Sequence, residues 1–173
     1  MAHVTLLNFP ANALVGDNDE NLVAGDGAAT FSNHNGRPCL AFDATAEEAV
    51  LTPEVAMPGQ YAGGTLMATA FFAMDSDATN HIVLDVGVEA TTPNADTIDM
   101  ETADSWDTIN AGTMSVGGTT AGDPLSLAVT LTNKDSVAAG DLVRFGIRRD
   151  CDSGNDDASG DLYLYALEIW EST

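Results

Sequence analysis

Two loops of the chain are rich in oxygen-bearing side chains that could bind a metal ion. The larger cluster contains Asp150, Asp152, Asn155, Asp156, Asp157 and Asp161. The smaller cluster covers residues 17–21. Calcium takes about six to eight oxygen ligands, often from such loops. An EF-hand loop needs glycine at its sixth position, however, where these clusters have Asn155 and Leu22. With 27 acidic residues among 173, chance clustering explains the pattern better, so we expect solvated loops, no metal and no cofactor.

Catalytic motifs are absent from the sequence. The three histidines, His3, His34 and His81, are widely separated, and two cysteines are too few for a structural zinc site. The chain has neither the GxSxG elbow of a serine hydrolase nor a phosphate-binding glycine loop. A glycosidase uses a pair of carboxylates, but such a pair cannot be distinguished among so many acidic residues. We therefore predict a protein that is not an enzyme.

The charge of the chain limits its partners. Its 27 acidic and 5 basic residues give a net charge of −22. Nucleic acid and anionic membrane surfaces are excluded as partners, because binding to their phosphates needs lysine and arginine. Two explanations of the charge stay open: a solubility device, including adaptation to salty water, and a face that docks on a basic partner.

The cysteines and the N-terminal residues bear on the compartment. Cys39 and Cys151 are expected to be unpaired, as is usual for thiols in a reducing cytoplasm. The first residues lack the basic and apolar regions of a signal peptide. We therefore expect synthesis and folding in a cytoplasm.

Strands must position any site, and they are clearest in the last third of the chain. Apolar and polar residues alternate over residues 125–132, 141–149 and 162–170, which indicates half-buried strands. Similar segments at 65–74 and 81–90, with an Asn-Gly turn at residues 33–36, extend the pattern. Residues 45–51 combine a capping-box pattern with an early proline, and we favour a strand through 49–51 over a helix.

Together these segments predict an all-β fold. About eight or nine short strands with little or no helix favour an antiparallel, jelly-roll-like β-sandwich. We expect a single sandwich domain over residues 28–173, preceded by an N-terminal arm and loop over residues 1–27. No internal repeat or domain linker interrupts it.

Residues 65–74 and residues 162–170 carry apolar side chains on both faces of the expected strand. In residues 162–170, Tyr163 and Tyr165 are expected to be buried, which leaves Leu162, Leu164 and Trp170 on the opposite face. Contiguous apolar surface usually marks an interface. We therefore predict a homo-oligomer, most simply a trimer, with those three residues at the interface. Arg144 and Arg148 share a strand face, and either intramolecular ion pairs or inter-subunit salt bridges would explain them.

Several segments resemble a known group of proteins. They are residues 37–43, 57–65, 136–145, 149–150 and 160–169. Their order and spacing resemble small β-sandwich structural proteins of tailed bacteriophages. The resemblance implies a non-enzymatic virion protein, made in the host cytoplasm. Such a protein would be a capsid decoration (cement) protein that binds its own copies and the major capsid protein, or another virion protein, and stabilises the shell.

A carbohydrate-binding β-sandwich module, or a tail- or fibre-associated adhesion protein, is the alternative. A glycan site needs exposed aromatic rings. Since the tyrosines at 163 and 165 are expected to be buried, Trp106 and Trp170 are the candidates for such a platform.

Overall fold

A computed structural model describes residues 2–17, 22, 27–76 and 80–173. The chain forms two sheets packed face to face, with a three-residue 3-10 helix, η1 (Ala11–Ala13), as the one helical element of the described residues. All strand pairs are antiparallel apart from the short parallel pair β3–β6. The predicted all-β sandwich is therefore confirmed.

The strands divide into a six-stranded and a seven-stranded sheet, which we call sheet A and sheet B. Sheet A contains β1 (His3–Pro10), β4 (Thr30–His34), β5 (Arg37–Phe42), β8 (Thr65–Met74), β11 (Leu125–Leu131) and β13 (Leu162–Ser172). Sheet B contains β2 (Val15–Gly16), β3 (Gly27–Ala28), β6 (Glu48–Leu51), β7 (Val55–Ala56), β9 (His81–Thr91), β10 (Asn110–Ser115) and β12 (Leu142–Arg149).

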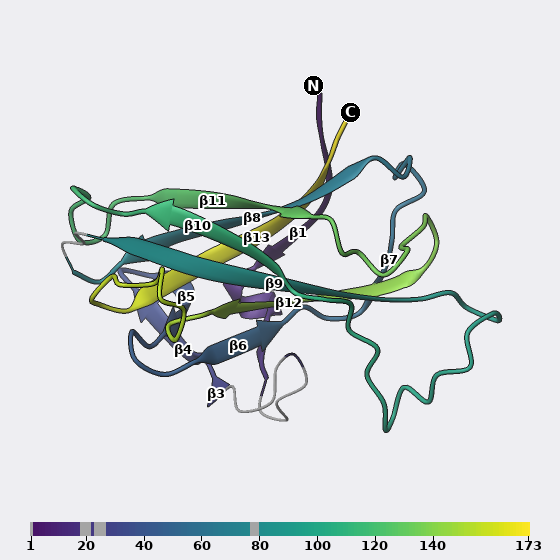
Figure 1. Ribbon diagram of the computed structural model, residues 1–173, viewed down its shortest axis with the longest axis horizontal. Coiled ribbons are helices and arrows are strands. Elements are labelled where there is room, and N and C mark those ends of the chain that lie inside the picture. The colour runs from purple at the N-terminus through teal and green to yellow at the C-terminus, as the bar shows by residue number, and fades with distance from the viewer. Residues whose placement is uncertain (1, 18–21, 23–26, 77–79) are drawn as a thin grey trace.

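The order of strands in sheet A is β11-β8-β13-β5-β4, with β1 beside the second half of β13. The order in sheet B is β10-β9-β12-β6-β2. Figure 1 shows the two ends of the chain side by side and the long β9–β10 loop extending from the body. Ala2 and Thr173 join the ends through two backbone hydrogen bonds of 2.7 and 3.1 Å.

The inner faces of the two sheets form the core. Alternate residues of each strand point inward, as the pleat requires. Large side chains with no more than 1% exposure include Phe42, Phe72, Phe145, Leu84 and Ile147. The strands predicted at residues 65–74 and 81–90 are confirmed as β8 and β9, and the inward-facing row of each strand is buried.

A β-bulge in β13 corrects the prediction for the tyrosine strand. Leu164 pairs with Phe72 while Ala166 pairs with the next residue, Phe71, so Tyr165 is the extra residue. A bulge reverses the side-chain alternation beyond it. Leu162 and Leu164 consequently lie in the core, both 0% exposed, on the same side as Leu167. The tyrosines face outward and are half-buried, contrary to the prediction.

The expected N-terminal arm is in part a strand of the sandwich. β1 pairs with β13 from His3 to Pro10, and its Leu6 and Phe9 are buried. Apolar side chains at these positions dock the segment on the core instead of leaving it as a free arm. The part of the expected loop at residues 18–21 and 23–26 lies outside the described residues.

Several local predictions are confirmed. Asn35 and Gly36 have φ of 52° and 79°, the left-handed values that an Asn-Gly hairpin turn needs. Residues 48–51 form the strand β6 and no helix. None of the helical structure in the described ranges has the length or hydropathy to span a bilayer.

Candidate functional site

The outer face of sheet B is occupied by ion pairs within the chain. Arg144 lies opposite Glu89 on the neighbouring strand and contacts both Glu89 and Asp104. Arg148 lies opposite Asp85, whose carboxylate it contacts at 2.9 Å. Cross-strand pairing of opposite charges accounts for both arginines. The structure therefore favours the intramolecular explanation over an inter-subunit salt bridge.

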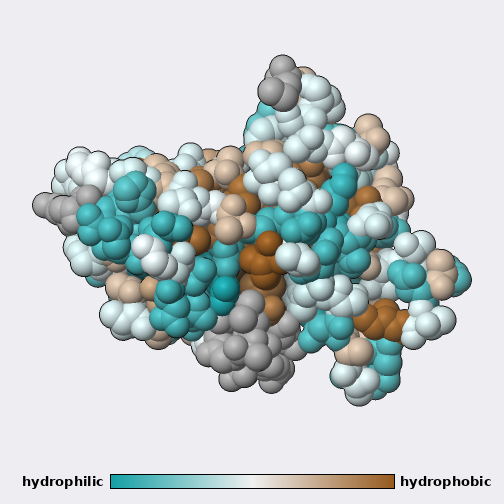
Figure 2. All heavy atoms as spheres, viewed as in Figure 1, coloured by the Kyte–Doolittle hydropathy of each residue, from teal (hydrophilic) through white to brown (hydrophobic). Residues whose placement is uncertain are grey.

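The loop between β9 and β10 covers this same face. Gly87 and Gly146 are directly opposite each other, and a Cβ at Gly146 would lie 2.8 Å from a methyl of Leu22. The paired glycines thus leave room for Leu22 and for Trp106, which packs beside Arg144 at 4.7 Å. Trp106 therefore anchors the loop and is not an exposed aromatic platform for a glycan. Figure 2 shows a mostly hydrophilic surface with small hydrophobic areas.

The acidic loop 150–161 is held by the chain itself. The Arg149 side chain, 0% exposed, pairs with Asp156, 1% exposed, at 2.8 Å and donates at 2.7 Å to the carbonyls of Ala158 and Gly160. Asp157 accepts from the backbone of His81. Within the described residues no group of acids, histidines and cysteines is arranged to hold a metal. Cys39 and Cys151 are both free thiols.

The outer face of sheet A is different, because aromatic rings stand on it. Phe71 pairs with Ala166, Trp170 with Met67, and Tyr163 with Ala73. Directly paired residues share a face, so Phe71, Tyr163 and Trp170 lie together with the bulged Tyr165. We call these four residues the aromatic face. Phe71 is 39% exposed, although it is large and apolar.

Two hollows adjoin the aromatic face at Tyr165 and Arg37, and together we call them the groove. The larger, of about 550 Å³, lies between the β4–β5 hairpin and the loop before β11 and is lined by His34, Asn35, Arg37, Phe71, Phe72, Ala73, Gly122, Pro124, Leu125 and Tyr165. The smaller, of about 340 Å³, extends from Tyr165 and Arg37 to Pro10 and Asn12. Ligand sites typically have such volumes and a few polar groups among apolar walls.

The hairpin that forms one wall of the groove is fixed by ring contacts. His34 meets the edge of Tyr163 at 3.9 Å between ring centroids. Burial raises the pKa of the Tyr165 phenol, which keeps its proton available for donation. The Arg37 side chain makes no hydrogen bond or ion pair with the described residues, so its guanidinium is available to a ligand.

The other end of the aromatic face is held by a small polar network. The His3 ring stacks on Trp170, with centroids 4.1 Å apart and 9° between the planes. Trp170 donates its indole N–H to Thr69 at 2.9 Å. His3 and Thr5 bond the carboxylate of Glu168 at 2.9 and 2.5 Å. Trp170 is therefore fixed in orientation, with one side of its ring covered.

The Glu168 network predicts a pH-dependent contribution to stability. Burial raises the pKa of the Glu168 carboxyl, but hydrogen bonds from Thr5 and His3 lower it more, so the folded pKa lies below its usual value. A depressed folded pKa gives stability above the unfolded pKa, which is lost as the pH falls through the folded pKa. Glu168→Gln should therefore lower the free energy of unfolding at about pH 7 and change it little at strongly acidic pH. Denaturant titrations across this range check it, and a pH-independent difference would contradict it.

The predicted site residues are thus dispersed. Leu162 and Leu164 are in the core, Arg144 and Arg148 lie on sheet B, and Trp170 alone of the five is on the aromatic face. Reasoning from the sequence missed Phe71 and Tyr165. The signal for them was the pair of apolar faces in residues 65–74 and 162–170, which pointed to exposed surface on these strands.

Comparison with known proteins finds solved structures of similar fold. No protein-family model matches the chain, and no curated protein matches it significantly. A solved xylan-binding module, CBM15, is similar with a TM-score of 0.50 and 14% identity over 97% of this chain and 98% of that one. An exo-β-1,3-galactanase from Phanerochaete chrysosporium has the same TM-score and identity over 95% of this chain, which spans 29% of the enzyme's length.

At these identities the likeness concerns the fold. The similar structures include a xylan-binding module and part of a glycan-degrading enzyme, so the comparison does not decide whether the chain has an activity. The small β-sandwich expected from the resemblance to phage proteins is confirmed, whereas the capsid decoration family itself is not shown. The chain is an all-β sandwich of the jelly-roll-like type found in carbohydrate-binding modules.

Proposed function

We propose that the protein is a non-catalytic carbohydrate-binding module whose ligand lies in the groove. The observation that carries the proposal is the combination of Tyr165, Phe71 and Arg37 around two hollows on an otherwise open sheet face. Aromatic rings offer flat apolar surfaces, and a tyrosine adds a hydroxyl. A sugar ring presents both C–H groups and hydroxyls, so it matches this mixed surface.

The groove also supplies hydrogen-bonding groups at its rim. His34, Asn35 and Arg37 belong to one hairpin and line the larger hollow. Such convergent polar groups orient a ligand while the apolar wall provides contact area. Neutral glycans suit the chain best, because polyanionic glycans would meet its net charge of −22.

The direct test is binding to a panel of soluble neutral polysaccharides that includes xylan and galactan, the glycans of the structural neighbours. Affinity electrophoresis and calorimetry with oligosaccharides would measure the interaction. We expect retardation by at least one glycan and no release of reducing sugar. If no member of the panel bound, the proposal would be rejected.

Tyr165→Ala is expected to weaken glycan binding by at least about tenfold, since central aromatic contacts dominate such interfaces. Phe71→Ala should act in the same direction. Trp106→Ala provides the matched aromatic control, because Trp106 packs on sheet B and does not line the groove. Calorimetry on variants of verified fold gives the comparison. Equal losses from Trp106→Ala and Tyr165→Ala would exclude the groove as the binding site.

A second candidate, a structural role in a phage virion, is favoured by the exposed part of the same face. Phe71, Met67 and Trp170 form partly exposed apolar surface that a second copy would cover. A trimer in light scattering that Phe71→Ser disrupts, without glycan binding, would support the virion role. A monomer that binds glycan would support the carbohydrate-binding module.

A further inference from the structure

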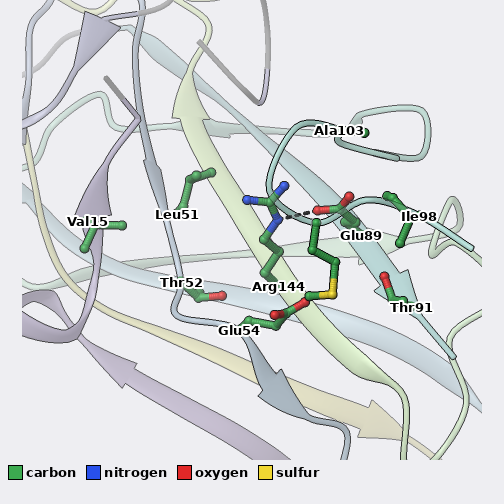
Figure 3. Close-up of a pocket in the computed structure, with 10 residues that line it drawn as sticks. Val15, Leu51, Thr52, Glu54, Glu89, Thr91, Ile98, Ala103 and Arg144 are labelled. Carbon is green, nitrogen blue, oxygen red and sulfur yellow. Dashed lines mark hydrogen bonds and ion pairs between the residues drawn. The ribbon is translucent and has the colours of Figure 1, made fainter. Parts of the chain in front are cut away.

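A separate pocket lies on the other sheet, where the β9–β10 loop meets β12. It has a volume of about 180 Å³ and is lined by Val15, Leu51, Thr52, Glu54, Glu89, Thr91, Ile98, Met100, Ala103 and Arg144. Figure 3 shows Arg144 between Leu51 and Thr52 on one side and Glu89 and Thr91 on the other. The pocket shares no residue with the groove, so it is independent of the proposed glycan site.

The electrostatics of the pocket favour a cation. Arg144 is the single basic residue of the lining, and Glu89 and Asp104 both contact it. Glu54 is exposed at the rim and has no hydrogen bond or ion pair within the part of the chain that the structure describes. The carboxylates therefore outnumber the guanidinium, and one of them is open to a ligand.

The walls of the pocket are apolar and unusually exposed. Val15 is 57% exposed and Met100 is 52% exposed, two of the four large hydrophobic side chains left most open to solvent among the described residues. Leu51 and Ile98 continue the same lining. A ligand that combines a cation with an aliphatic stem would cover this surface.

One hydroxyl of the lining has no partner within the described residues and is open to a ligand. Thr91 is 8% exposed and lines the pocket, and its hydroxyl makes no hydrogen bond to the rest of the described chain. The oxygen itself is not fully enclosed, so a ligand that carries a hydrogen-bond donor can reach it from the pocket.

We propose that this pocket binds the lysine side chain of a basic peptide segment in a partner protein. The stem lies between Val15 and Met100, and the ammonium group donates to Glu54 and to the Thr91 hydroxyl. An ammonium with three rotatable donors suits two separate acceptors, whereas a guanidinium favours a planar, bidentate carboxylate. The net charge of −22 attracts such a segment from a distance.

Calorimetry with a synthetic peptide of repeated Lys-Gly-Ser units tests the proposal. Glu54→Gln should weaken binding about tenfold, as expected for loss of one charge-assisted hydrogen bond. Asp152→Asn is the matched control, because it removes the same charge from an exposed residue of the 150–161 loop. It should change affinity by less than about twofold, since exposed charges away from a contact act weakly.

The same peptide with acetylated lysines should not bind, because acetylation removes the charge and leaves the stem. Thr91→Val should also lower the affinity for the lysine peptide, as Glu54→Gln does. Equal effects of Glu54→Gln and Asp152→Asn would reduce the interaction to general charge attraction and overturn the proposal. Absence of binding by the wild-type protein, or equal binding of the acetylated peptide, would overturn it as well.

Discussion

Arg149→Met is expected to lower the free energy of unfolding by about 3–5 kcal/mol, because it leaves a buried carboxylate without its partner. The Arg149 and Asp156 side chains are 0% and 1% exposed and form a two-point contact. The substitution also removes the donors to the carbonyls of Ala158 and Gly160, which fix the end of the acidic loop. Urea unfolding followed by circular dichroism measures the effect.

Arg37→Met is the matched control for this substitution. The Arg37 side chain is exposed and makes no hydrogen bond or ion pair with the described residues, so its loss should change stability by less than about 0.5 kcal/mol. The double variant Arg149→Met/Asp156→Leu should be more stable than Arg149→Met alone, since no unpaired buried charge remains. Similar stabilities of Arg149→Met and the wild type would mean that the loop is not held by this pair.

Leu164→Ala is expected to lower the free energy of unfolding by about 2–5 kcal/mol, the range for a leucine truncated in a packed core. Leu164 is 0% exposed. It faces the core together with Leu167 because the bulge at Tyr165 reverses the alternation of side chains along β13. The molecular mass in solution should stay unchanged, whatever the oligomeric state. Thermal or denaturant unfolding and light scattering give the two readouts.

Leu142→Ala is a suitable comparison, because Leu142 is only partly buried at the start of β12. It should lower stability by clearly less than Leu164→Ala. A Leu164→Ala variant of unchanged stability and smaller mass would restore the original interface prediction for this residue. It would also contradict the placement of the bulge.

The strands of the sandwich could be predicted because their alternation is local. Residues 65–74 match β8, and the Asn-Gly pair marks the β4–β5 hairpin. The bulge could not be predicted in the same way. A single extra residue exchanges the inward and outward faces of β13. Because both faces of this strand carry apolar residues, the sequence did not indicate which side chains face the core.

The site depended on contacts between distant segments. Tyr165 and Arg37 line the same hollow although about three quarters of the chain separates them, and no local pattern reports such proximity. Arg149 did carry a signal, because alternation along β12 places it on the same side as Val143, Phe145 and Ile147. An arginine on an inward-facing row indicates a buried charge that must have a partner. Its partner, Asp156, could not be singled out among so many acids.

The most direct test of the proposed carbohydrate-binding role is an NMR titration of the labelled protein with the oligosaccharide that binds best in the panel. We expect shifts to concentrate on the hairpin at residues 33–37, on Phe71 and on Tyr165, with the amides of sheet B unchanged. Shifts confined to the residues around Arg144, or no shifts at saturating oligosaccharide, would contradict a glycan site on the aromatic face.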